Sequence, residues 1–88
     1  MYLYPIRNLI INKDSSIEFL IDSIFDSYVK ARNYLEADLF KGIKKIDSED
    51  FENMLTKLNL KIYDISEVYL LEQNEKQYYY FINEIKLN

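Results

Sequence analysis

Residues 41–82 read KGIKKIDSEDFENMLTKLNLKIYDISEVYLLEQNEKQYYYFI, and this stretch decides the fold that the sequence predicts. A basic turn around Gly42 is followed by a short helix over residues 47–59. β-Branched and aromatic residues then become common, which is typical of strands. The polar residues 73–76 separate Val68–Glu72 from Gln77–Asn83, so a C-terminal β-hairpin is predicted.

The helix over residues 47–59 has clear start signals. Asp47 is well placed as its N-cap, and Ile46 and Phe51 have the spacing of a hydrophobic staple. Helical spacing then links Phe51 to further apolar residues, which are Met54, Leu55 and Leu58. The positive end of the helix dipole favours early carboxylates, which gives a structural reason for Glu49 and Asp50.

The N-terminal half is predicted to be mainly helical. Ser15 precedes Glu18 by three residues, which is the capping-box spacing, so a helix is expected to begin near residue 16. Its core stripe recurs at steps of four and three, at Ile17, Ile21, Ile24, Tyr28, Ala31 and Leu35. Helical structure is expected through Leu39 and Phe40, ending at Gly42, the only glycine. A stripe of this kind also fits a coiled-coil seam between two copies, so a homodimer stays open.

A single domain is predicted over residues 1–88, with an arm or strand at 1–13, a helical part at 15–59 and the hairpin at 60–88. Residues 2–12 are apolar but are interrupted by Pro5, Arg7 and Asn8. This pattern leaves a strand and a short docking helix both open.

The order of elements over residues 15–83 resembles a winged-helix domain. The resemblance implies an α+β fold in which helices are followed by a C-terminal β-hairpin, the wing. It also implies that the helix at 47–59 reads the major groove of DNA, while the wing touches the backbone or the minor groove. Some members of this family bind proteins instead.

Composition argues against catalysis. The chain has no histidine and no cysteine, so the usual general base, the best nucleophile and any thiolate metal site are all missing. We therefore expect no enzyme activity, no catalytic residue, no metal site and no cofactor. The lack of cysteine fits a reducing compartment, and no apolar run approaches the roughly 20 residues needed to span a bilayer. A cytoplasmic location without membrane contact is expected.

The charge distribution favours a protein partner over DNA. The net charge is −4, and residues 47–88 carry four lysines against nine carboxylates. Nucleic-acid binders usually present a basic face, because neutralised phosphates supply most of the non-specific affinity. The strand at 77–83 is bulky on both sides, and only one side is expected to face the core of so small a domain. An aromatic face is therefore expected to remain for solvent, for a partner chain or for stacked bases.

We predict a small intracellular protein–protein interaction domain, such as an accessory subunit or inhibitor from a virus or mobile element, that binds a basic or aromatic partner surface. Its predicted contact residues are Glu49, Asp50, Glu52, Asn53, Tyr78, Tyr80 and Phe19. The alternative is a winged-helix DNA-binding transcriptional regulator, which would contact phosphates through Lys41, Lys44, Lys45, Lys57 and Lys76. Mimicry of DNA by the carboxylates is a third hypothesis.

Overall fold

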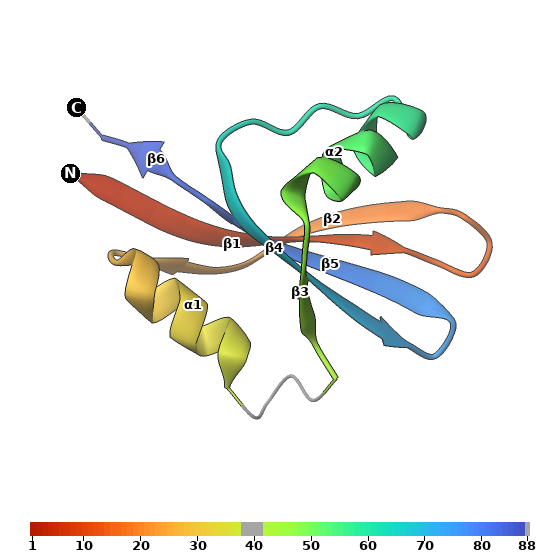
Figure 1. The fold of residues 1–88 in the computed structure, drawn as a ribbon, viewed down its shortest axis with the longest axis horizontal. Coiled ribbons are helices and arrows are strands. Elements are labelled where there is room, and N and C mark those ends of the chain that lie inside the picture. The colour runs from red at the N-terminus through yellow and green to blue at the C-terminus, as the bar shows by residue number, and fades with distance from the viewer. Residues whose placement is uncertain (38–41, 88) are drawn as a thin grey trace.

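One antiparallel sheet makes up most of the fold (Figure 1). The computed structural model describes residues 1–37 and 42–87. The described elements are β1 (Tyr2–Ile11), β2 (Ile17–Phe25), α1 (Tyr28–Glu36), β3 (Lys44–Ile46), α2 (Ser48–Lys57), β4 (Ile65–Gln73), β5 (Lys76–Asn83) and β6 (Ile85–Lys86). The order across the sheet is β2-β1-β5-β4-β3, and β6 pairs with the start of β1.

The winged-helix resemblance and the predicted fold class are both wrong. Strands open and close the described chain, and two short helices are inserted between them, whereas the prediction placed the helices first. The predicted helical part, residues 15–59, contains the strands β2 and β3. Residues 1–13, for which an arm and a strand were both open, contain β1, which lies inside the sheet between β2 and β5.

The first part of the predicted N-terminal helix forms the strand β2, because the preceding residues supply a pairing partner, whereas its later part forms α1 with Ala31 and Leu35 buried as predicted. Ser15 has a φ of 71° in the turn that joins β1 to β2, and Asp14 Oδ1 accepts a hydrogen bond from Ser16 N at 2.9 Å. Glu18 accepts a hydrogen bond from Asn12 Nδ2 at 3.1 Å instead of capping a helix. The expected capping box is therefore part of a hairpin, in which β1 provides hydrogen-bond partners for the main chain of β2.

The two helices cover opposite faces of the sheet (Figure 1). On β5, Tyr80 and Ile82 pack in the core cluster that contains residues of α1. The alternating Tyr79 and Phe81 pack against α2, with ring centroids 5.3 and 5.5 Å from that of Phe51. The expectation of a free aromatic face on this strand is wrong, because a helix packs against each of its faces.

Pro5 fits an inner strand because the neighbour of β1 changes beside it. The ladder with β5 ends at Ile6, and the ladder with β6 covers Tyr2 and Leu3. Pro5 lies between these two ladders, where its missing N–H costs no ladder hydrogen bond. Residues 2–12 are therefore compatible with a long strand despite the proline.

The predictions for α2 and for the last hairpin are confirmed. Asp47 caps α2, and its Oδ1 accepts a hydrogen bond from Glu49 N at 2.7 Å. β4 and β5 pair around a two-residue turn formed by Asn74 and Glu75. The turn residues have φ values of 53° and 62°, as in the type I′ turns that match the twist of a hairpin.

Gly42 has the predicted left-handed conformation, with a φ of 87°, but it precedes β3 and does not end a described helix. The helix α1 ends at Glu36 and has Ala37 as its C-cap. The predicted helical continuation through Leu39 and Phe40 lies outside the described residues. Neither α1 nor α2 is long and apolar enough to cross a membrane.

Candidate interaction surface

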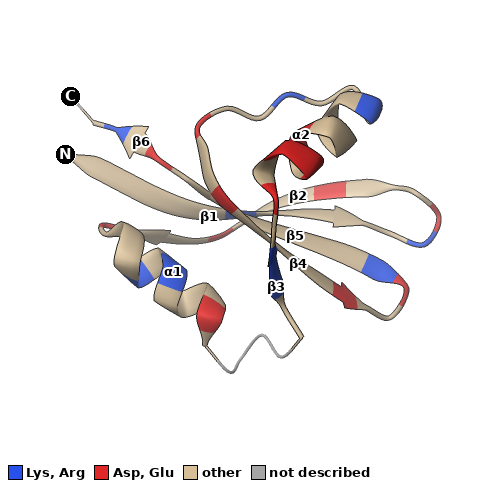
Figure 2. Cartoon of the chain, viewed as in Figure 1, with Lys and Arg blue, Asp and Glu red and all other residues tan. Residues whose placement is uncertain are grey.

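The two edge strands of the sheet differ in how well they are protected against further pairing. β3 is three residues long and carries Lys44 and Lys45, and short edges with lysine resist association. β2 is nine residues long and forms the opposite edge. Figure 2 shows β3 as a basic strand, whereas most of β2 is uncharged. Within the described sheet, β2 is therefore the edge that best suits another strand.

Large apolar side chains of β2 are exposed to solvent. The exposed fractions are 41% for Phe19, 52% for Leu20, 68% for Ile21 and 59% for Ile24. Phe19 is the cross-strand partner of Leu9, which packs in the same core cluster as α2, so Phe19 lies on the α2 face. Leu20 points to the α1 face, because side chains alternate along a strand. The edge thus presents apolar surface on both faces.

Alternate main-chain groups of β2 point away from the sheet. At the start of the β1–β2 ladder, Asn12 N donates to Ser16 O at 2.9 Å. Hydrogen-bonded and non-hydrogen-bonded pairs alternate in an antiparallel ladder, so this register directs the main-chain groups of Glu18 and Leu20 toward β1. The N–H and C=O groups that point outward are those of Ile17, Phe19 and Ile21.

The carboxylates of β2 are held by neighbours within the chain. Glu18 accepts a hydrogen bond from Asn12 Nδ2 at 3.1 Å. Asp22 is the extra residue of a β-bulge, and its hydrogen bond with the Tyr34 hydroxyl raises the pKa of Tyr34. These contacts draw the two charges toward the molecule's own side chains, so the outer edge over Ile17–Ile21 is mainly apolar.

The predicted acidic contact residues all lie on α2. Glu49, Asp50, Glu52 and Asn53 are exposed, and the ion pairs found among the described residues include none of them. Glu49 and Asp50 belong to the first turn, where the helix dipole favours negative charge. The start of α2 is therefore an acidic surface (Figure 2).

The aromatic residues of the predicted site are separated by the sheet. Tyr80 is only 8% exposed, and Tyr78 packs against the same core cluster as Tyr80, on the α1 face. Burial raises the pKa of Tyr80. Phe19 is exposed on the α2 face, although it belongs to a strand and not to the expected helix. Phe19 and the α2 acids thus share one face, whereas the two tyrosines point to the other.

The lysines of the DNA-binding alternative lie on several elements. Lys44 and Lys45 are adjacent on β3, so their side chains point to opposite faces. Lys57 is in the last turn of α2, Lys76 begins β5, and Lys41 lies outside the described residues. Lys45 Nζ is 3.3 Å from Glu67 Oε1. Their placement gives no single basic face within the described part of the chain.

Glu67 of β4 is a buried carboxylate that receives donors from three elements. The Tyr28 hydroxyl of α1 donates to its Oε1, and the Tyr69 hydroxyl donates to its Oε2 at 2.5 Å. Lys45 of β3 approaches the same Oε1. Burial, together with the hydrogen bond to Glu67, raises the pKa of Tyr69 well above its ordinary value. Because both oxygens are engaged, the cluster joins α1 and β3 to β4.

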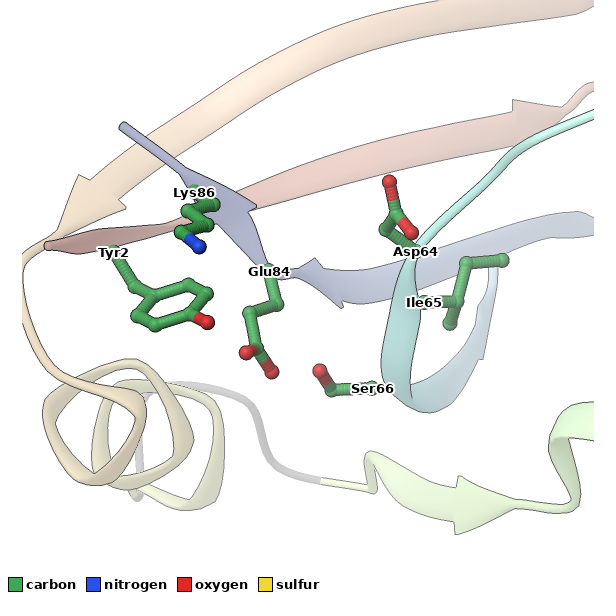
Figure 3. Close-up of a pocket in the computed structure, with 6 residues that line it drawn as sticks. All are labelled: Tyr2, Asp64, Ile65, Ser66, Glu84 and Lys86. Atoms are coloured by element: carbon green, nitrogen blue, oxygen red, sulfur yellow. The ribbon is translucent and has the colours of Figure 1, made fainter. Parts of the chain in front are cut away.

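A polar hollow of about 420 Å³ lies beside the β1–β6 pair (Figure 3). Its lining residues are Tyr2, Asp64, Ile65, Ser66, Glu84 and Lys86. Figure 3 shows Tyr2, Glu84 and Ser66 directing their side chains into it. In residues 1–37 and 42–87, no three side chains of the metal-binding types gather at one point. The hollow thus contains charges of both signs without a recognisable catalytic set.

Sequence reasoning identified Phe19 but missed the edge to which it belongs. Ile21 and Ile24 were assigned to the core of a helix, yet both are exposed on β2. The available signal was weak, because Ile17, Phe19 and Ile21 fit a strand period but only Glu18 of the two residues between them is polar.

Comparison with known proteins assigns the chain to no family. No family model matches it, and searches of curated proteins and of solved structures found no match. Function is therefore inferred from the surface itself.

Proposed function

We propose that this chain is an intracellular, non-catalytic protein-interaction module whose partner adds a strand to β2. The observation that carries the proposal is a nine-residue edge strand with four large apolar side chains, each exposed by 41% or more. Proteins usually shorten, charge or cover such an edge, because its free main-chain groups template pairing with another chain. β3 has this protection in the same sheet, whereas β2 is nine residues long and the charges of its Glu18 and Asp22 are drawn toward the chain's own side chains.

Strand addition suits the chemistry of this edge. The outward N–H and C=O groups of Ile17, Phe19 and Ile21 provide the ladder hydrogen bonds, which contribute affinity without depending on partner sequence. The side chains provide selectivity, because Phe19 and Ile21 favour apolar residues opposite them on the α2 face. Burial of this apolar surface stabilises the complex further, at roughly 25 cal/mol for each Å².

The acidic start of α2 is proposed as a secondary contact on a basic partner surface. Glu49, Asp50 and Glu52 are exposed, and α2 packs on the same face of the sheet that presents Phe19. Charges at the rim of an interface mainly accelerate association and select partners. Reversing Glu49 and Glu52 to lysine is therefore expected to slow association more than it speeds dissociation.

The test compares two variants that place a lysine at similarly exposed apolar positions. Ile21→Lys puts a charge on the β2 edge, whereas Val29→Lys puts one on α1, where Val29 is 59% exposed. Partners are captured from cells, identified and purified, and their binding to each variant is then measured by titration calorimetry. We expect Ile21→Lys to weaken binding at least about tenfold and Val29→Lys to leave it unchanged. Equal binding by both variants would exclude the β2 edge.

A further inference from the structure

We infer that the strand added to β2 is β2 of a second copy of this chain, paired antiparallel in a register centred on Phe19. This inference rests on the proposed function, because it names the partner of the same edge. It concerns β2 alone, since the described part of a second copy presents no single basic face to the acidic start of α2. In this register Phe19 meets Phe19 of the other copy, and Ile17 meets Ile21. Two sheets would then join edge to edge around a twofold axis, which makes the contact self-complementary.

The main-chain geometry allows this register and limits the alternatives. The outward N–H and C=O groups belong to Ile17, Phe19 and Ile21, which are spaced symmetrically about Phe19. Centring the pairing on Phe19 brings all three into ladder positions with the same three residues of the other copy. Centring it on Leu20 would also pair outward groups, those of Phe19 with those of Ile21, so the main chain excludes only registers that place an outward residue opposite one directed toward β1.

The charges distinguish between the registers that the main chain allows. With Phe19 at the centre, Glu18 lies opposite Leu20, and Asp22 lies opposite Ser16, so no two carboxylates face each other. With Leu20 at the centre, Glu18 would lie directly opposite Asp22, and like charges at opposed positions are destabilising. Glu18 is also drawn toward β1 by its hydrogen bond from Asn12 Nδ2 at 3.1 Å.

The bulge at Asp22 sets the length of the pairing. It breaks the regular alternation after Ile21, so the regular edge runs over Ile17–Ile21. A five-residue segment with Phe19 in the middle is symmetric about that residue. The interface is thus short, and its stability depends on the apolar side chains as well as on the ladder.

Association is measured by sedimentation equilibrium on the full chain over a wide concentration range. The wild-type chain is expected to form a dimer that Ile21→Lys weakens by about tenfold or more, because the lysine would enter the paired edge. Val29→Lys is the matched control and should dimerise as the wild type does. Circular dichroism of both variants checks that each remains folded.

The register is tested with single cysteines, since the chain has none of its own. Opposed Cα atoms in a hydrogen-bonded antiparallel pair lie about 5.5 Å apart, within the range that a disulfide bridges. Phe19→Cys should therefore oxidise to a covalent dimer, and a mixture of Ile17→Cys and Ile21→Cys should form the mixed dimer. Ile21→Cys alone should not, because its two copies would lie four residues, or about 14 Å, apart along the strands.

The outcomes separate this inference from the proposed function. A dimer that Ile21→Lys weakens, together with the predicted cross-links, supports both. A monomer at every concentration overturns self-pairing, while the capture experiment still decides whether β2 binds a different protein. A dimer that Ile21→Lys leaves unchanged overturns self-pairing through β2, and cross-linking of Ile21→Cys to itself overturns the Phe19 register.

Discussion

Replacing Glu67 by methionine should destabilise the fold by about 3 kcal/mol. The buried carboxylate accepts hydrogen bonds from Tyr28 and Tyr69. Each hydrogen bond to a charged group contributes roughly 1.5–3 kcal/mol. The loss is moderated because Tyr28 is only half-buried and the Tyr69 hydroxyl keeps Glu36 Oε1 as a weaker acceptor at 3.4 Å. Part of this loss is offset because methionine has no charge to desolvate. Lys45 contributes little, since its side chain is 55% exposed and the ion pair is screened.

A triple variant separates the hydrogen bonds from side-chain packing. Combining Glu67→Met with Tyr28→Phe and Tyr69→Phe removes the acceptor together with both donors. Replacing both sides of a buried hydrogen bond by apolar groups is often nearly neutral. The triple variant should therefore recover most of the stability that the single variant loses. Glu67→Gln keeps one acceptor oxygen and should lose about half as much as Glu67→Met.

The assay is urea unfolding followed by circular dichroism. With a denaturant dependence of roughly 1–3 kcal/mol per M, a loss of 3 kcal/mol lowers the midpoint by about 1–3 M. A single variant that loses less than about 1 kcal/mol would refute the assigned strength of the Glu67 hydrogen bonds. A triple variant no more stable than the single one would refute the reasoning as well.

Three further predictions address the turn, the tyrosines and DNA. Glu75→Gly should raise the free energy of unfolding by about 0.5–1 kcal/mol in the same urea assay. Glycine adopts the φ of 62° at lower cost than glutamate does, and this gain exceeds the small contribution of the exposed ion pair with Lys13 that the change removes. Burial is the largest cause that raises the pKa of Tyr69, Tyr79 and Tyr80 in the fold, so the unfolded chain loses these phenol protons first. The contribution of these tyrosines to stability should therefore be fully present below pH 10.0, the ordinary tyrosine pKa, and should fall above it, as thermal unfolding at several alkaline pH values will show. Fluorescence anisotropy should detect no binding to double-stranded DNA at about 50 mM salt, and micromolar binding that weakens steeply at about 200 mM would contradict this.

The second half of the fold could be predicted because its signals are local. The Asp47 cap acts within one turn, and the β4–β5 hairpin forms between neighbouring segments around Asn74 and Glu75. Local signals of this kind need no knowledge of the rest of the chain. Both predictions were therefore confirmed even though the fold class was wrong.

The first half could not be predicted because its sequence fits two periods. Ile17, Ile21 and Ile24 match a helical stripe, whereas Ile17, Phe19 and Ile21 match a strand. The choice depends on a distant partner, since β1 lies between β2 and β5 and pairs with both. The edge character of β2 depends on strand order, which local patterns do not contain. Phe19 was thus predicted as a contact residue, but its position on an edge strand was not predicted.

Amide hydrogen exchange of β2, resolved residue by residue by NMR, shows whether β2 is the edge at which a partner strand is added. In the dilute monomer, the amides of Ile17, Phe19 and Ile21 should exchange fast, while those of Glu18 and Leu20, directed toward β1, should be protected. Association, with a second copy or with a captured partner, should protect the first group. Protection of the first group already in the dilute monomer, or no gain of protection on association, would contradict β2 as the interaction edge.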